Sequence, residues 1–176
     1  MKSTLNSKAK KIKLIAMDVD GVLTDGGIIL GNKEELKFFN VQDGMGISLA
    51  KQGGLTVVII TGRKSKAVSR RARELGIEEV HQKSQDKVKI IEHLMSKYNL
   101  TKDGVAYIAD DVMELLPFQK TGFKIAVSNA VKEVKEVADY ITTSEGGHGA
   151  VREAIEFILK AQNKWDKLIK NYRGSI

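Results

Sequence analysis

Leu14-Ile15-Ala16-Met17 runs directly into Asp18-Val19-Asp20-Gly21-Val22-Leu23-Thr24, and this junction points to the architecture of the chain. The apolar run predicts a buried strand, and two aspartates lie where that strand ends. Open α/β sheets bind their ligands at the carboxyl ends of parallel strands. Two carboxylates one residue apart can hold an oxygen-seeking cation such as Mg²⁺ there. The alternative is a plain turn in which the aspartates serve as Asx caps.

Strands and helices are expected to alternate along the rest of the chain, which indicates an α/β fold with a parallel sheet covered on both faces. The clearest further strand is 55–60, a continuous apolar and β-branched run of the kind found in buried parallel sheets. A helix is expected over 65–75, after this strand, and Gly76 is placed as its C-terminal cap. The other expected strands are 79–80, 105–109, 123–127 and 139–141, and the other helices are 86–98, a short one ending near Pro117, 131–137 and 150–160, with a helical stripe continuing over 165–172.

One segment interrupts this alternation. Ile28-Ile29-Leu30, Gly31-Asn32 and Leu36-Lys37-Phe38-Phe39 together predict a β-hairpin inserted after the first strand. The hairpin has few residues of its own domain to pack against, and exposed apolar hairpins usually pair with another subunit. We therefore expect one domain over residues 1–176, with an insertion at about 26–40, a C-terminal tail at about 161–176 and no separate cap domain.

Composition narrows the class of protein. The chain has 176 residues, 42% of them hydrophobic, which suits one globular domain with a core. No apolar run approaches the ~20 residues of a membrane span, so no membrane role is expected. The basic N-terminus lacks the apolar region of a signal peptide and is expected to be a frayed lead-in to the first strand. The absence of cysteine excludes thiolate chemistry and weakly favours the cytoplasm.

The net charge of +7 suits either a nucleic-acid binder or an enzyme for an anionic substrate. Aromatic residues make up 6% of the chain and are not interleaved with the basic clusters, as a base-stacking surface would require. We therefore favour a small anionic substrate and expect no nucleic acid.

Three further polar features lie at or beside predicted strand ends. Thr61-Gly62-Arg63 offers a hydroxyl and a backbone N–H for phosphate oxygens, although an ordinary turn with a threonine cap would look the same. Lys87 opens a helix, where its charge opposes the helix dipole, so either it has a specific partner or it is simply exposed. Asp110-Asp111 would repel each other without a cation, and a helix cap explains only one of the two.

The order of these features carries more weight than any one of them. DxDGV, TGR, a lysine and DD on successive βα units resemble the four motifs of the haloacid dehalogenase superfamily, in particular its small, capless phosphatases. The resemblance covers nearly the whole chain, and it includes the 39–44 and 146–153 stretches that are typical of this branch.

The resemblance implies a role for each motif residue. Asp18 would be the nucleophile that forms an aspartyl-phosphate, and Asp20 the general acid and then the base. The same resemblance implies that Mg²⁺ is held by the Asp18 carboxylate, the Asp20 main-chain carbonyl and Asp110, with Asp111 supporting the metal shell. It also implies that Thr61, Gly62 and Lys87 bind phosphate and that Arg63 and Asp43 bind substrate.

The expected reaction is Mg²⁺-dependent hydrolysis of an 8-phosphorylated octulosonate, a phosphorylated sugar acid used in lipopolysaccharide precursor synthesis. A nine-carbon ulosonate 9-phosphate, another sugar phosphate, or a non-catalytic binding module are the alternatives. The family also implies a homotetramer in which the hairpin of one subunit, and the tail around 170–176, help to close a site.

The chain departs from its relatives at three positions. Ala109 replaces a usual glycine before the aspartate pair, Gln42 stands where a basic residue is common, and Glu114 is the nearest counterpart of a later acid. The Gln42 departure makes the sugar less secure than the type of reaction.

Overall fold

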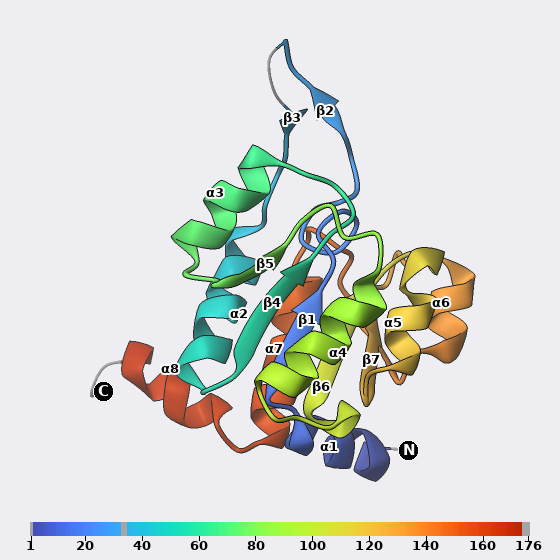
Figure 1. Ribbon diagram of the computed structural model, residues 1–176. Helices are drawn as coiled ribbons and strands as arrows, with labels where there is room; N and C mark the ends of the chain where they lie inside the picture. The colour runs from blue at the N-terminus through green and yellow to red at the C-terminus, as the bar shows by residue number, and fades with distance from the viewer. Residues whose placement is uncertain (1, 33–34, 174–176) are drawn as a thin grey trace.

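The computed structural model describes residues 2–32 and 35–173, and its centre is a six-stranded parallel sheet between two layers of helices (Figure 1). The strand order is β5-β4-β1-β6-β7-β8, which places the strand before the two aspartates at the middle of the sheet. The strands are β1 (Leu14–Met17), β4 (Thr56–Ile60), β5 (Glu79–His81), β6 (Val105–Ala109), β7 (Phe123–Ala126) and β8 (Tyr140–Ile141).

The central strands are buried along nearly their whole length, as their continuous apolar sequences predict. Met17, the last residue of β1, is paired in register with Ile59 on one side and with Ile108 on the other. The carboxyl ends of β1, β4 and β6 therefore lie side by side at one edge of the sheet.

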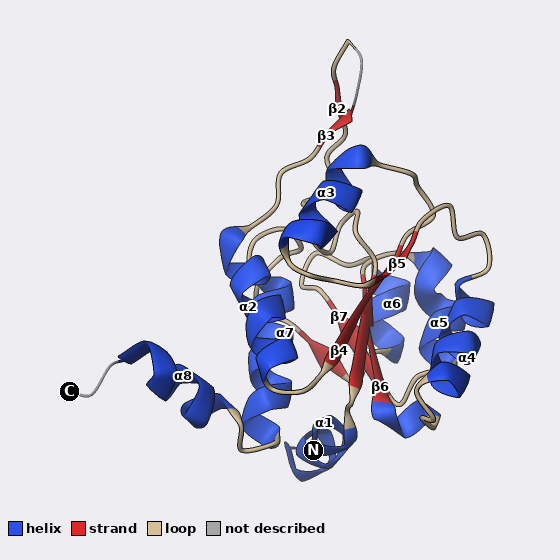
Figure 2. Ribbon diagram, turned by 60° about the vertical axis from the view of Figure 1, so that its left-hand side comes forward, coloured by secondary structure: helices blue, strands red, loops and turns tan. Residues whose placement is uncertain are grey.

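The helices cover both faces of the sheet (Figure 2). The helices α2, α3 and α7 lie on one face, and α4, α5 and α6 on the other. The helices are α1 (Lys2–Lys11), α2 (Val41–Gln52), α3 (Lys66–Glu74), α4 (Lys87–Lys97), α5 (Leu115–Gln119), α6 (Lys132–Val137), α7 (Ala150–Ala161) and α8 (Trp165–Arg173), with 3₁₀ turns η1 (Lys102–Gly104) and η2 (Val112–Glu114).

Local capping explains where the helices near the site begin and end. The Ser65 hydroxyl accepts from the Val68 N–H at the start of α3, and the Asp86 carboxylate accepts from the Lys89 N–H at the start of α4. Gly76 follows α3 with φ +61°, a left-handed conformation that glycine adopts without strain, so the predicted cap is confirmed.

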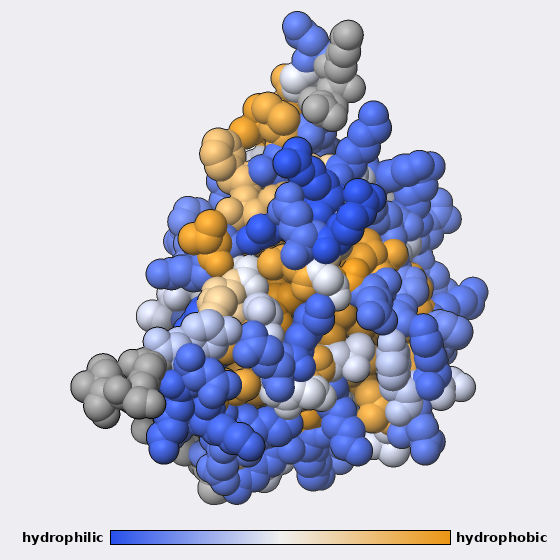
Figure 3. Space-filling model, turned by 90° about the vertical axis from the view of Figure 1, so that its left-hand side faces the viewer, coloured by the Kyte–Doolittle hydropathy of each residue, from blue (hydrophilic) through white to orange (hydrophobic). Residues whose placement is uncertain are grey.

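The predicted hairpin is also confirmed. Its strands, β2 (Ile29–Leu30) and β3 (Glu35–Leu36), are antiparallel, and Ile29 is paired with Leu36. It projects from the body beyond the end of α3, at the same end of the sheet as the carboxyl ends of the strands (Figure 1). Apolar side chains gather along it and its base (Figure 3). No separate cap domain is present in the described part of the chain.

The expectation of a frayed N-terminus is wrong, because the first residues form α1. Ala9 and Ile12 are buried in the core, and the Gln162 amide donates to both of their carbonyl oxygens, at 3.2 and 2.7 Å. Lys8 forms an ion pair with Asp139 at 2.6 Å. The basic composition of α1 gives no local sign of a helix, because the helix is stabilised by contacts with distant parts of the chain.

The sequence patterns also did not predict α2. Two glycines, Gly44 and Gly46, weaken its intrinsic helix propensity. Gly46 is needed for packing, since a Cβ there would lie 2.9 Å from the Arg152 Cα of α7. At the other end of the chain, α8 confirms the helical stripe that was expected over 165–172. The tail around 170–176 was expected to help close a site, and its last residues, 174–176, lie outside the described residues. No helix in the described ranges is long and apolar enough to cross a membrane.

Candidate active site

One cavity at the carboxyl edge of the sheet collects nearly all of the predicted site residues. It has a volume of about 320 Å³, within the range of small-molecule sites. Three other surface hollows have similar volumes, so the lining and not the size distinguishes this one. Every predicted site residue except Asp43 lines it, together with Gly21, Gly26, Met113 and Glu114.

Asp18 is held at both of its carboxylate oxygens. The Val19 N–H donates to Oδ1 at 2.7 Å, and the Lys87 ammonium lies 2.9 Å from Oδ2. The main-chain N–H of Asp18 itself donates to the Ile108 carbonyl of the neighbouring strand at 3.2 Å. The side chain is therefore fixed in orientation at the end of β1, with its carboxylate facing the cavity.

Lys87 is buried, so of the two alternatives left by the sequence, a specific partner or simple exposure, the structure supports a specific partner. Its ammonium pairs with Asp18 and also with Glu114, whose other oxygen accepts a 2.5 Å hydrogen bond from the Tyr107 hydroxyl. Tyr107 and Glu114 are almost wholly buried. Burial lowers the pKa of Lys87, but the attraction of the two carboxylates outweighs it and keeps the lysine charged. Glu114 thus anchors Lys87.

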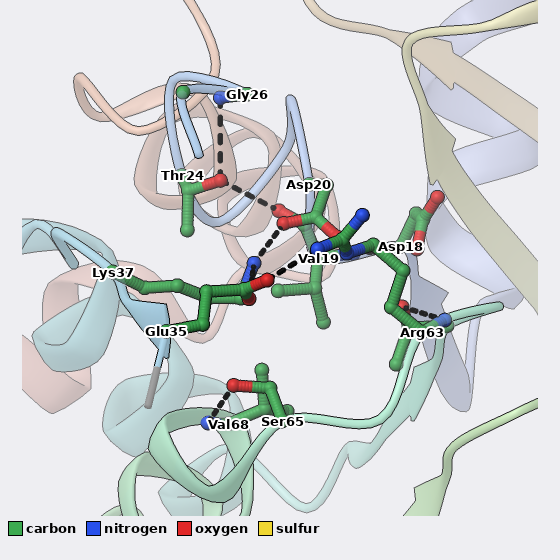
Figure 4. Close-up of polar contacts among 12 residues, drawn as sticks. Asp18, Val19, Asp20, Thr24, Gly26, Glu35, Lys37, Arg63, Ser65 and Val68 are labelled. Carbon is green, nitrogen blue, oxygen red and sulfur yellow. Dashed lines mark hydrogen bonds and ion pairs between the residues drawn. The ribbon is translucent and has the colours of Figure 1, made fainter. Parts of the chain in front are cut away.

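Asp20 belongs to a second polar cluster, formed with the hairpin (Figure 4). Lys37 pairs with Asp20 and, at 2.7 Å, with Glu35, while Arg63 lies 3.6 Å from the other Asp20 oxygen and also binds Glu35. Burial lowers the pKa of Lys37, but its hydrogen bonds to the two carboxylates raise it overall. The cluster contains two cations and two carboxylates.

The Asp110 carboxyl group forms no ion pair with a cationic side chain in the described ranges. Burial, together with the nearby Asp18 and Asp111 carboxylates, raises the pKa of Asp110 to about 7. Gly21 leaves room for it, since a Cβ there would lie 1.9 Å from Asp110 Oδ2, and its φ of +79° also favours glycine. Asp111 caps η2 through the Val112 N–H at 2.6 Å.

This arrangement fits a hard divalent cation. Oxygen is the only ligand type offered, which suits Mg²⁺. Within the described ranges no three His, Cys, Asp or Glu side chains are already arranged as a metal cluster. The set expected from the sequence has a different composition, because it combines the carboxylates of Asp18 and Asp110 with the main-chain carbonyl of Asp20. A cation would stabilise the ionised form of Asp110, which burial and the neighbouring carboxylates disfavour.

Thr61 and Gly62 form the wall next to β4. Thr61 is almost fully buried, and its hydroxyl accepts from the Arg63 N–H at 3.3 Å, which folds the turn tightly. The Gly62 N–H has no hydrogen-bond acceptor among residues 2–32 and 35–173. An N–H without an acceptor, on the same cavity as Lys87, is suited to an anionic oxygen.

Asp43 does not reach this cavity. It is 1% exposed, and its carboxylate accepts from the N–H groups of Gly149 and Arg152, at 3.3 and 2.8 Å. Both oxygens are used to cap the start of α7, so Asp43 lies apart from the cavity that the other predicted site residues line. Gln42, on the first turn of α2, lines a separate hollow beside α7.

Sequence reasoning missed Lys37, Glu35 and Tyr107. A usable signal existed for Lys37, which stands between the apolar residues Leu36 and Phe38 in a strand-like segment where successive side chains point to opposite sides. Tyr107 offered no signal, because it reads as one more apolar residue of a buried strand. Ala109 lies within β6 in extended backbone, so its methyl group causes no strain.

Comparison with known proteins places the chain among phosphatases. The sequence profile of the haloacid dehalogenase-like hydrolases matches residues 77–155. The Escherichia coli K12 protein named 3-deoxy-D-manno-octulosonate 8-phosphate phosphatase KdsC is 43% identical over 162 residues, covering 92% of this chain and 86% of the relative.

Solved structures agree with this result. A 3-deoxy-D-manno-octulosonate 8-phosphate phosphatase from Moraxella catarrhalis, crystallised with a magnesium ion, a phosphate ion and KDO, is 46% identical with a TM-score of 0.94, over 98% of this chain and 99% of that one. The cobalt-bound deoxy-D-mannose-octulosonate 8-phosphate phosphatase from Haemophilus influenzae is 36% identical with a TM-score of 0.87, over 90% and 93% of the two chains.

Proposed function

The chain belongs to the haloacid dehalogenase-like hydrolases, in the group of 3-deoxy-D-manno-octulosonate 8-phosphate phosphatases, and on this premise we propose that it hydrolyses 3-deoxy-D-manno-octulosonate 8-phosphate to the sugar acid and phosphate. The observation that carries the proposal is the cavity in which Asp18, Lys87 and Asp110 converge at the carboxyl edge of the sheet. Because phosphoryl transfer depends on positioning and charge neutralisation, this set of groups suits the reaction.

We assign the nucleophile to Asp18. One of its carboxylate oxygens forms a bond to phosphorus while the bond from phosphorus to the sugar oxygen breaks, which leaves an aspartyl-phosphate. The bond from the Val19 N–H and the pairing with Lys87 hold the carboxylate for this attack. Water then attacks the phosphorus and releases phosphate and free Asp18.

Asp20 is assigned as the group that moves the proton. In the first step its carboxyl group donates a proton to the departing sugar oxygen, and in the second its carboxylate accepts a proton from the attacking water. Its position two residues after Asp18, on the turn beyond β1, places both carboxyl groups on the same cavity.

Mg²⁺ is the cofactor that fits this site. Asp18, Asp110 and the Asp20 main-chain carbonyl would hold it, with Asp111 supporting the metal shell. When bound, it supplies positive charge that offsets the charge of the transferring phosphoryl group. The residues of the chain supply the rest: Thr61, Gly62 and Lys87 bind phosphoryl oxygens, and Arg63 faces the substrate at the cavity mouth.

The test of this proposal is phosphate release from 3-deoxy-D-manno-octulosonate 8-phosphate, measured with Mg²⁺ and with a chelator. We expect metal-dependent turnover that Asp18→Asn abolishes. Asp166→Asn, the same chemical change at an exposed position of α8, is the matched control and should retain full activity. A wild-type protein that releases phosphate from neither this substrate nor an aryl phosphate would refute the proposed function.

The same assay decides between sugars. If a nine-carbon ulosonate 9-phosphate has the higher kcat/KM, the type of reaction stands and the substrate assignment changes, because specificity is the ratio of these constants.

We also propose that the protein is a homotetramer assembled through the hairpin. Leu30 and Phe38 are 82% and 75% exposed, and large apolar side chains clustered this way favour burial against another subunit (Figure 3). Replacing Ile28, Ile29 and Phe38 with serine should dissociate the assembly and lower activity together, as measured by light scattering and phosphate release. Full activity in a monomeric variant would show that each site is self-contained.

A further inference from the structure

The arm that leads from the hairpin back to α2 presents two different sides. Leu36 and Phe38 are exposed, whereas the Lys37 side chain between them is 1% exposed. Successive side chains of an extended segment point in opposite directions, so the apolar residues on one side force the lysine to the other. That other side faces Asp20 (Figure 4).

Lys37 uses only one of the two Asp20 oxygens. Its ammonium pairs with Oδ1, whereas Oδ2, among residues 2–32 and 35–173, has one cationic partner, the Arg63 guanidinium at 3.6 Å, which is longer than a hydrogen bond. On its far side Lys37 is held by Glu35 at 2.7 Å, and Glu35 is held in turn by Arg63. The lysine is therefore fixed from two directions, and the second oxygen of Asp20, a residue that lines the cavity, accepts no hydrogen bond from the described part of the chain.

We propose that Lys37 is a positioning residue for proton transfer by Asp20, in that it holds Oδ1 and leaves Oδ2 to exchange a proton with the sugar oxygen. The inference rests on the proposed phosphatase activity and adds a residue to it. The proton moves from Asp20 Oδ2 to the sugar oxygen as the bond between that oxygen and phosphorus breaks, and Asp20 later regains a proton from the attacking water. Lys37 neither gains nor loses a proton in this sequence.

The need for this proton depends on the leaving group, which gives the proposal a specific signature. A sugar alkoxide is a poor leaving group without a proton, whereas a nitrophenolate leaves readily as an anion. A residue that acts through Asp20 must therefore matter for the sugar phosphate and much less for an aryl phosphate. A residue that only stabilises the fold would affect both substrates equally.

The experiment compares kcat/KM of wild type and Lys37→Met on 3-deoxy-D-manno-octulosonate 8-phosphate and on a nitrophenyl or dinitrophenyl phosphate that the wild type cleaves. Methionine keeps the length of the side chain without its charge. General acid catalysis contributes about 10²–10⁴-fold, so we expect a loss of about tenfold or more on the sugar phosphate and less than about threefold on the aryl phosphate. Asp20→Asn should show the same selectivity with larger losses.

Both rates are measured on one preparation, so their ratio does not depend on how much of the protein is folded. Lys164→Met is the matched control, because the Lys164 ammonium also makes a partly buried contact, 2.7 Å from the Gly53 carbonyl, far from the cavity. Equal losses of Lys37→Met on both substrates, or no loss on either, would overturn the proposal. A wild type that cleaves neither substrate would instead refute the phosphatase assignment.

Discussion

Asp110→Asn should stabilise the metal-free protein while it destroys the metal site. Burial and the neighbouring carboxylates raise the pKa of Asp110 from its ordinary value of 3.8 to about 7. Between these values the folded state binds more protons than the unfolded state, so the free energy of unfolding falls as the pH rises. The penalty is absent below the unfolded value and complete above about 7. Asparagine has no charge to bury, so Asp110→Asn removes this loss of stability.

The size of the effect follows from the two pKa values. Each pKa unit corresponds to about 1.4 kcal/mol, so the full difference would cost about 4 kcal/mol. Asp110 is only half-buried, and screening by water should reduce this to about 2 kcal/mol. For a chain of this length we expect Asp110→Asn to raise Tm by about 4–8 °C at pH 8. At pH 5 the expected gain is less than about 1 kcal/mol.

The assay is thermal unfolding followed by circular dichroism at pH 5 and pH 8, in a chelator and then in excess Mg²⁺. Mg²⁺ should raise the Tm of the wild type, because a ligand that binds only the folded state stabilises it. It should raise the Tm of Asp110→Asn much less, and Asp166→Asn should behave like the wild type throughout. The reasoning fails if the Tm gain of Asp110→Asn in chelator is the same at both pH values.

Three further outcomes follow from the packing around the site. Gly21→Ala should weaken Mg²⁺ binding in titration calorimetry, because the new methyl group would collide with Asp110 and strain a positive φ; unchanged affinity would contradict this. Tyr107→Phe leaves a Glu114 oxygen unsatisfied and should cost about 1.5–3 kcal/mol in urea unfolding, and a cost below about 0.5 kcal/mol would mean the bond is not formed. Ala9→Asp buries a charge in the core and should lower Tm markedly, whereas a truly frayed N-terminus would tolerate it.

Much of the fold was predictable because its signals are local. Continuous apolar runs identified the central strands β1, β4 and β6, and Gly76 marked the end of α3 through its backbone freedom. The two helices that were misjudged, α1 and α2, have weak local signals and are held by contacts with distant parts of the chain. Gly46 illustrates the reason: it lowers helix propensity locally, yet it permits the close approach to α7 that makes α2 stable.

The sequence by itself determined the carboxyl-edge residues of this protein, since Asp18, Thr61 and Asp110 each directly follow a strand that its own composition specifies. Strand ends converge in a parallel sheet whatever the details of packing. Only the tertiary structure decided which polar residues reach that edge from elsewhere. It buried Asp43 under α7, brought Lys37 from the hairpin to Asp20, and placed Glu114 behind Lys87. Such pairings depend on side-chain direction and on contacts between residues far apart in the chain, which local patterns do not encode.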